Sequence, residues 1–203
     1  MLKTKIAVLV SGGGTNLQAL IDAQRSGIIK SGEIIAVISD KPGAYALERA
    51  KAADIASYVV CKKECSSREE FESKLQETLS NAGAEMIILA GFMCILSADF
   101  TRKWQNSIIN VHPSLIPSFC GEGFYGLHVH EAALGYGVKV TGATVHFVNE
   151  IPDGGKIILQ KAVEIKDGDT PSVLQRRVME EAEWKILPQA AEIVSADIAA
   201  SKQ

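Results

Sequence analysis

The sequence lacks the patterns that mark membrane, secreted and nucleic-acid-binding proteins. The apolar run at residues 5–10 (KIAVLV) is far too short to cross a bilayer, and the chain begins without a signal-peptide pattern. Basic residues are not in excess, because 21 Lys and Arg stand against 24 Asp and Glu, whereas nucleic-acid-binding proteins usually carry a basic surplus. We therefore expect a cytoplasmic protein that binds neither membranes nor nucleic acid.

Cysteine is also scarce, with four in 203 residues. In a cytoplasmic protein these thiols are expected to stay reduced. Cys61 and Cys65 are close in sequence, but they lack the neighbouring His and Cys residues that a four-ligand zinc site requires. The sequence therefore predicts neither structural disulfides nor a bound metal.

The first half of the chain alternates between short apolar runs and amphipathic segments. Such runs are typical of strands buried on both faces of a parallel sheet, with a helix between successive strands. The serines at 66 and 67 precede REEF with capping-box spacing, and Gly83 is a suitable stop for the helix that follows. We expect strands at 5–10, 34–38, 56–60, 86–90 and 107–111, and helices at 17–26, 44–53, 67–81 and 97–104.

The pattern changes after Pro113. Residues 113–130 are rich in Gly, Pro and aromatic residues and predict a long loop, and residues 139–148 and 156–165 predict an antiparallel strand pair. A long helix is expected from about residue 171, with Pro188 breaking or kinking it. With no repeat or linker, the chain predicts one α/β domain over residues 1–203. Its sheet is Rossmann-like, open, twisted and mainly parallel, with an antiparallel C-terminal strand pair and a C-terminal helix.

A glycine-rich turn, residues 11–16 (SGGGTN), lies between the first predicted strand and the first helix. Glycines permit close approach of a ligand, and a helix N-terminus offers free N–H groups to an anion. The full dinucleotide fingerprint and the Walker lysine are both missing. Two interpretations stay open at this point: a phosphate cradle, or a tight turn capped by Thr15 or Asn16.

Three polar residues indicate acid–base chemistry at the far end of the predicted sheet. Asn110 and His112 are two apart at the end of a strand, so their side chains point the same way. Asp153, in a Pro-Asp-Gly-Gly turn, could reach the same edge and would raise the pKa of His112. Taken singly, His112 could be a buried structural histidine and Asp153 an ordinary turn residue.

The remaining histidines give weaker signals. His128 and His130 could suggest metal ligands, but no acidic partner has the necessary spacing, and Glu131 is more simply the start of a helix. His146 shares its strand face with Thr144, so it could belong to the core or approach the site. We favour a structural role for His146.

Six segments, in order and spanning almost the whole chain, resemble phosphoribosylglycinamide formyltransferase, a folate-dependent family of purine biosynthesis. They are KIAVLVSGGGTNLQAL, MIILAGFMCILS, INVHPSLIPSF, VTGATVHFV, PDGGKIILQ and EAEWKILP. The string from Asn110 to Pro117 is by itself diagnostic of folate-dependent formyltransferases.

The resemblance implies transfer of a formyl group from 10-formyltetrahydrofolate to the amine of phosphoribosylglycinamide, without a metal. It implies a phosphate-binding part over 1–110 and a folate and catalytic part over 111–203, in a monomer or a homodimer. The implied catalytic residues are Asn110, His112 and Asp153. The implied substrate residues are Gly13, Gly14, Thr15, Asn16, Pro113 and Glu183. The implied folate residues are Arg68, Met93, Cys94, Ile95, Leu96 and Asn110.

The chain departs from the family's pattern in a few places. Cys94 stands where several relatives have Arg, Trp184 stands where His is common, and the loop over residues 118–126 is longer than in the shortest relatives. Related activities remain as alternatives: formyltetrahydrofolate hydrolase, methionyl-tRNA formyltransferase and sugar-nucleotide formyltransferase. The relatives with these activities are usually longer. A non-catalytic phosphate-binding module is the alternative from another class.

Overall fold

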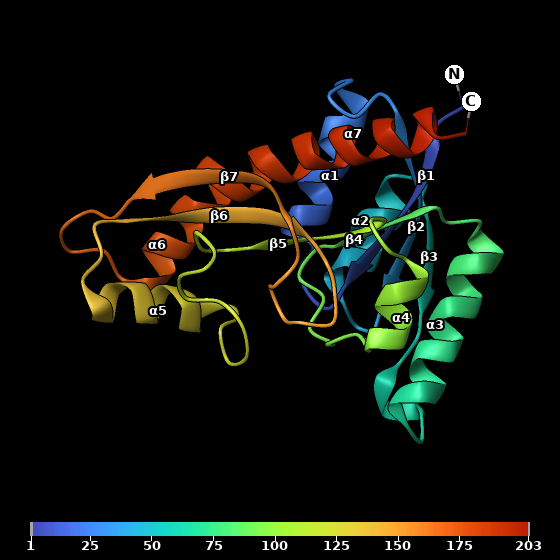
Figure 1. Ribbon diagram of the computed structural model, residues 1–203, viewed down its shortest axis with the longest axis horizontal. Helices are drawn as coiled ribbons and strands as arrows, with labels where there is room; N and C mark the ends of the chain where they lie inside the picture. The colour runs from blue at the N-terminus through green and yellow to red at the C-terminus, as the bar shows by residue number, and fades with distance from the viewer. Residues whose placement is uncertain (1, 203) are drawn as a thin grey trace.

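The computed structural model describes residues 2–202 and is built around one seven-stranded sheet (Figure 1). The strand order is β3-β2-β1-β4-β5-β6-β7, in which β1 to β5 are parallel and β6 and β7 are antiparallel. The strands are β1 (Thr4–Val10), β2 (Gly32–Ser39), β3 (Ala56–Val59), β4 (Met86–Leu89), β5 (Ile108–His112), β6 (Val140–Phe147) and β7 (Ile157–Glu164). This sheet confirms the predicted fold class.

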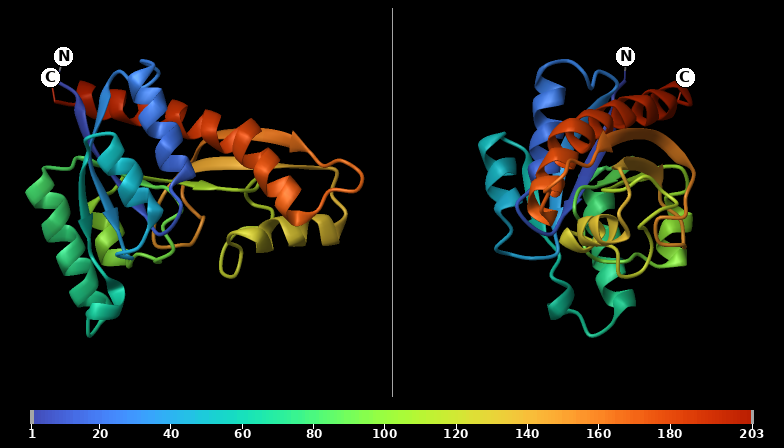
Figure 2. Two further views of the ribbon diagram at one scale, coloured as in Figure 1. Left: turned by 180° about the vertical axis from the view of Figure 1, so that it is seen from behind. Right: turned by 90° about the vertical axis from the view of Figure 1, so that its left-hand side faces the viewer.

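Helices cover both faces of the central parallel strands, which explains why β1 and β4 are almost entirely buried. On β1, Ile6, Val8 and Val10 pack with α1, α2 and α7, whereas Ala7 and Leu9 pack with α3 and α4. Figure 2 shows α7 crossing the sheet on the same face as α1. The helices are α1 (Thr15–Arg25), α2 (Tyr45–Ala52), α3 (Arg68–Ala82), α4 (Ala98–Lys103), α5 (Leu127–Tyr136), α6 (Pro171–Val178) and α7 (Trp184–Ala200), with a 3-10 turn at Lys62–Glu64 and a π-helical turn at Met179–Glu183.

The start and stop predicted for α3 are both confirmed. The Ser67 hydroxyl accepts a hydrogen bond from the Glu70 amide, and the Glu70 carboxylate accepts one from the Ser66 amide. Gly83 ends the helix with a left-handed φ of 73°, a conformation that glycine adopts without strain. This capping fixes the first residue of α3, Arg68, at one end of the sheet.

One prediction about the C-terminal half was wrong. The loop after Pro113 ends earlier than predicted, because α5 begins at Leu127 and not near Glu131. The long closing helix is confirmed, because the chain is helical from Pro171 to Ala200, with a π-helical turn between α6 and α7. Pro188 lies inside α7 and does not end it, although it removes one backbone hydrogen bond from the helix.

Three further observations concern membrane spans, metal clusters and cysteines in residues 2–202. No helix there has the length and apolar character needed to cross a membrane. No cluster of His, Cys, Asp and Glu residues in the same range has the arrangement of a metal site. The four cysteines carry free thiols.

Candidate active site

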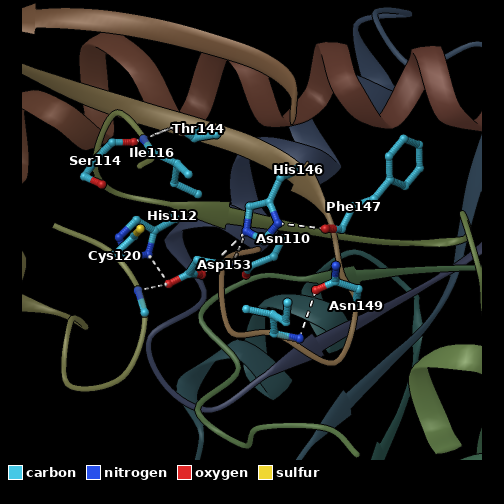
Figure 3. A network of polar contacts seen from close by, with 12 residues as sticks. Asn110, His112, Ser114, Ile116, Cys120, Thr144, His146, Phe147, Asn149 and Asp153 are labelled. Atoms are coloured by element: carbon cyan, nitrogen blue, oxygen red, sulfur yellow. Dashed lines mark hydrogen bonds and ion pairs between the residues drawn. The ribbon is translucent and has the colours of Figure 1, made fainter. Parts of the chain in front are cut away.

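Polar side chains from β5 and from the turn after β6 meet at one place, as the sequence predicted. Asn110 and His112 lie on the same side of β5, and Asp153 belongs to the turn between β6 and β7. Asp153 has a positive φ of 56°, which Asp tolerates better than most residues. Figure 3 shows its carboxylate between the imidazole rings of His112 and His146.

The Asp153 carboxylate lies close to three nitrogen atoms. Its Oδ2 atom lies 3.4 Å from Nδ1 of His112 and accepts a 2.8 Å hydrogen bond from the Gly121 amide, and its Oδ1 atom lies 3.5 Å from Nε2 of His146. Burial favours the neutral acid, but the neighbouring His146 and His112 rings and the Gly121 amide together lower the pKa of Asp153. Asp153 is therefore an ionised carboxylate at neutral pH.

His112 is oriented by a backbone carbonyl on its other side. Its Nε2 atom lies 2.8 Å from the Phe119 oxygen, which can only accept, so Nε2 carries a hydrogen and Nδ1 faces Asp153. Asp153 raises the pKa of His112, as expected, but it does not set the net direction of the shift. Burial lowers the pKa of His112 by more than Asp153 and the Phe119 carbonyl raise it. A second proton, on Nδ1, would lie beside the Asp153 carboxylate, and burial makes that proton easier to lose.

His146 lies in the site, although we expected a structural role for it. Its Nδ1 atom donates to the Phe147 carbonyl at 2.8 Å, and its Nε2 atom lies 3.3 Å from Nδ2 of Asn110. Because the amide of Asn110 has two hydrogens, one stays available for a ligand. The signal in the sequence was the strand parity of His146, but its direct pairing with Asn110 across β5 and β6 required the register.

The glycine turn leaves the start of α1 open. Gly14 is the N-cap residue, in a left-handed conformation with φ 70° and ψ 34°, and no side chain caps the helix. The alternative in which Thr15 or Asn16 caps α1 is therefore wrong. The first amides of α1 are free of side-chain partners, so the turn has the arrangement that binds anions in other proteins.

Asn16 connects this turn to the C-terminal helices. Its Nδ2 atom donates to Oε2 of Glu183 at 2.8 Å. Glu183 is buried at the end of the π-helical turn, and burial raises its pKa to about 6 despite the bond from Asn16. The structure thus brings together Asn16 and Glu183, which are 167 residues apart in the chain.

The residues predicted to contact folate lie around the loop after β4. Arg68 donates to the Ile95 carbonyl at 2.9 Å and pairs with Glu72 at 3.1 Å, so its charge is partly neutralised. The side chains of Met93 and Ile95 are exposed. The others point elsewhere: Leu96 is packed in the core, and the Cys94 thiol faces Asp40, with its pKa raised to about 11 by burial and by that carboxylate. Pro113, predicted on the substrate side, is half-buried directly after His112.

A groove of about 650 Å³ opens between α1 and α7. Thr15 and Trp184 line it, so it borders the glycine turn and the segment that carries Glu183. Arg49 from α2 and Lys161 from β7 line it as well, and the sequence alone did not single out either residue. The groove is therefore lined by positive side chains, and Arg49 also contacts the turn.

The two histidines of α5 do not belong to a metal site. His128 forms an exposed pair with Glu131, with 3.1 Å between Nδ1 and Oε2. His130 is fully buried, and neither ring nitrogen has a hydrogen-bond partner among residues 2–202. Burial, with a smaller contribution from His112, lowers the pKa of His130 to about 4, so it is neutral at neutral pH.

Known proteins match this chain along almost its whole length. The model of the formyl transferase family matches residues 4–191. The phosphoribosylglycinamide formyltransferase of Haemophilus influenzae is 42% identical over 91% of this chain and 84% of its own length. The crystal structure of glycinamide ribonucleotide transformylase 1 from Symbiobacterium toebii superimposes with a TM-score of 0.89 at 41% identity, covering 96% of this chain and 89% of the other.

A longer relative shows the same similarity over part of its length. The human trifunctional purine biosynthetic protein adenosine-3 is 46% identical over 95% of this chain, but the chain spans only 18% of that protein. The family match and the full-length bacterial relative agree with the fold and with the segments that carry the resemblance. This chain belongs to the formyl transferase family and is similar over most of its length to the phosphoribosylglycinamide formyltransferases.

Proposed function

We propose that this chain transfers the formyl group of 10-formyltetrahydrofolate to the amine of 5'-phosphoribosylglycinamide in purine biosynthesis. The names of the relatives support the reaction class and the acceptor. The observation that carries the proposal is the contact of the Asp153 carboxylate with His112, beside the free amide hydrogen of Asn110. Acyl transfer between two nitrogens requires a group that moves a proton and a hydrogen-bond donor that stabilises the oxyanion, and these residues supply both.

In the proposed reaction, the acceptor amine attacks the formyl carbon and forms a C–N bond. The carbonyl oxygen gains negative charge, and the free hydrogen of Asn110 donates to it. The amine loses a proton, which Nδ1 of His112 receives beside the Asp153 carboxylate. The bond from the formyl carbon to N10 of the folate then breaks, and the same proton goes to N10. The lowered pKa of His112 favours an imidazole that becomes charged only during the reaction, with Asp153 stabilising that charge.

We propose that residues 1–110 and residues 111–203 bind different parts of the substrates. In residues 1–110, Gly13, Gly14 and Thr15 bind the substrate phosphate through backbone amides at the start of α1. Glu183 and Asn16, which are hydrogen-bonded to each other, hold the rest of the acceptor. Most of residues 111–203 shape the catalytic end of the site and, with the loop after β4, the folate slot.

The folate slot fits a donor with a flat aromatic head and an anionic tail. Met93 and Ile95 present exposed apolar side chains, as an aromatic ring system requires. The Arg68 side chain, 44% exposed, offers a cation at the same loop through its bond to the Ile95 carbonyl. These residues would hold the folate, whereas Leu96 supports the loop from the core.

Product analysis tests the proposal. Purified protein is mixed with both substrates, and the formylated acceptor, the deformylated folate and free formate are quantified by mass spectrometry. We expect one formylated acceptor for each folate consumed, and no turnover without the acceptor. Formate release in the absence of the acceptor would contradict the proposal and identify a formyltetrahydrofolate hydrolase. If no folate is consumed at all, the chain is a non-catalytic phosphate-binding module and the proposal is wrong.

A further inference from the structure

Helix α2 packs against the glycine turn and binds two of its successive carbonyls. The Ala46 amide donates to the Gly12 carbonyl at 3.0 Å, and Nε of Arg49 donates to the Gly13 carbonyl at 2.8 Å. The turn and the helix are in close contact, because a Cβ atom on Gly14 would lie 2.7 Å from that of Ala46. Two carbonyls of the turn are therefore directed toward α2.

The direction of these carbonyls fixes the direction of the amides that follow them. In a trans peptide the C=O of one residue and the N–H of the next point in opposite directions. The peptides after Gly12 and Gly13 are both trans. With both carbonyls bound to α2, the N–H groups of Gly13 and Gly14 point away from α2. A run of glycines would otherwise rotate its peptide planes with little steric cost.

Arg49 is itself held in position by several contacts. Its Nη1 atom donates to Oε1 of Gln18 on α1 at 3.0 Å, and its guanidinium carbon lies 5.1 Å from the centre of the Tyr45 ring. The planar guanidinium thus donates to the turn and to the first helix at once, which a lysine ammonium cannot match in geometry. Arg49 is half-buried, and its positive charge lies beside the turn where the anion would bind.

We propose that Arg49 is the positioning residue of the phosphate cradle, for a phosphate monoester as ligand. It holds the Gly13 carbonyl so that the Gly14 amide faces the anion, and it adds a positive charge behind the turn. This inference rests on the proposed phosphate-binding role of the turn. It does not place Arg49 in contact with the reacting atoms.

Steady-state kinetics of Arg49→Ala and Arg49→Lys test the role, with Lys51→Ala as a matched loss of charge on the same helix. We expect Arg49→Ala to raise the KM of the phosphorylated acceptor about tenfold, the factor for one lost hydrogen bond to a charged group. The kcat and the KM of folate should stay unchanged, and Arg49→Lys should restore part of the acceptor affinity. An acceptor KM no higher than in Lys51→Ala, or equal changes in all three constants, would overturn the proposal.

A titration that needs no turnover separates this proposal from the proposed function. Ribose 5-phosphate is added to 15N-labelled protein, and the amide signals of Gly13 and Gly14 are followed by NMR. We expect both signals to shift in the wild type, and the dissociation constant to rise about tenfold in Arg49→Ala. If Arg49→Ala does not fold, the Arg49→Lys titration decides: affinity equal to the wild type in that variant refutes the need for the forked guanidinium.

The two failures give different patterns. Formyl transfer in the wild type, with equal phosphate binding in wild type and Arg49→Ala, would refute the role of Arg49 alone. Phosphate binding that depends on Arg49, without formyl transfer, would refute the proposed function and leave the role of Arg49 intact.

Discussion

Replacement of Asp153 by Asn removes one negative charge and one proton acceptor while preserving the size of the side chain. Asp153 lies against His112, His146 and the Gly121 amide, and its charge favours the protonated form of His112. An Asn side chain is neutral and has only one acceptor oxygen, so its NH₂ group must face one of these three groups. The variant therefore loses both the proton path and part of the local order.

The magnitude follows from the role of a positioned acid–base group. Such groups contribute about 10²–10⁴-fold to a rate, which corresponds to roughly 3–5 kcal/mol of barrier. The charge of Asp153 also opposes the lowering of the His112 pKa by burial, so its removal makes the imidazole harder to protonate. We expect kcat to fall by about two to four orders of magnitude, while the KM values of both substrates change little.

The assay is initial-rate formation of the formylated acceptor across a pH series. Asp99→Asn is the control, because Asp99 is 89% exposed in its side chain and pairs only with Arg102. We expect Asp99→Asn to have the wild-type rate. In the wild type the acid limb of the profile should lie below the ordinary pKa of histidine, since the pKa of His112 is lowered. Near-normal turnover in Asp153→Asn would remove this carboxylate from the mechanism.

Three further variants test other parts of the site. Gly14→Ala should lower the melting temperature and weaken phosphate binding, because φ is 70° and the new Cβ would lie 2.7 Å from that of Ala46; an unchanged melting curve would contradict the packing. The free energy of unfolding of the wild type should fall by about 2 kcal/mol as pH rises from the ordinary carboxyl pKa through about 6. The reason is that the folded protein binds the Glu183 proton more tightly than the unfolded chain does. Glu183→Gln should remove this fall in urea unfolding, and a difference between wild type and variant that is independent of pH would refute the raised pKa of Glu183. His146→Ala should lower kcat about tenfold or more, but by a smaller factor than Asp153→Asn does. A wild-type kcat in this variant would show that His146 has only a structural role.

Most strands and the helices that follow them could be predicted because their signals are local. Residues 6–10 are all apolar, and this part of β1 is buried on both faces. The capping box at Ser67 and the stop at Gly83 depend on neighbours within one or two turns, so the bounds of α3 followed from the sequence. The convergence of Asp153 on His112 followed from strand direction together with the family resemblance.

The features that were missed depend on contacts between distant segments. The π-helical turn before Trp184 places Glu183 against Asn16, and nothing in the local pattern requires it. The direction of the His112 pKa shift is set by burial, which a sequence does not report. Arg49 acts through the Gly13 carbonyl, 36 residues away in the chain.

The central claim is that the acceptor amine, the formyl carbon and the side chains around Asp153 meet at one place. A crystal structure with phosphoribosylglycinamide and an unreactive 10-formyl folate analogue tests it most directly. We predict the phosphate on the amides of Gly13 and Gly14, and the formyl oxygen about 3 Å from Nδ2 of Asn110. A formyl carbon remote from Asn110 and His112, with the acceptor bound elsewhere, would contradict it.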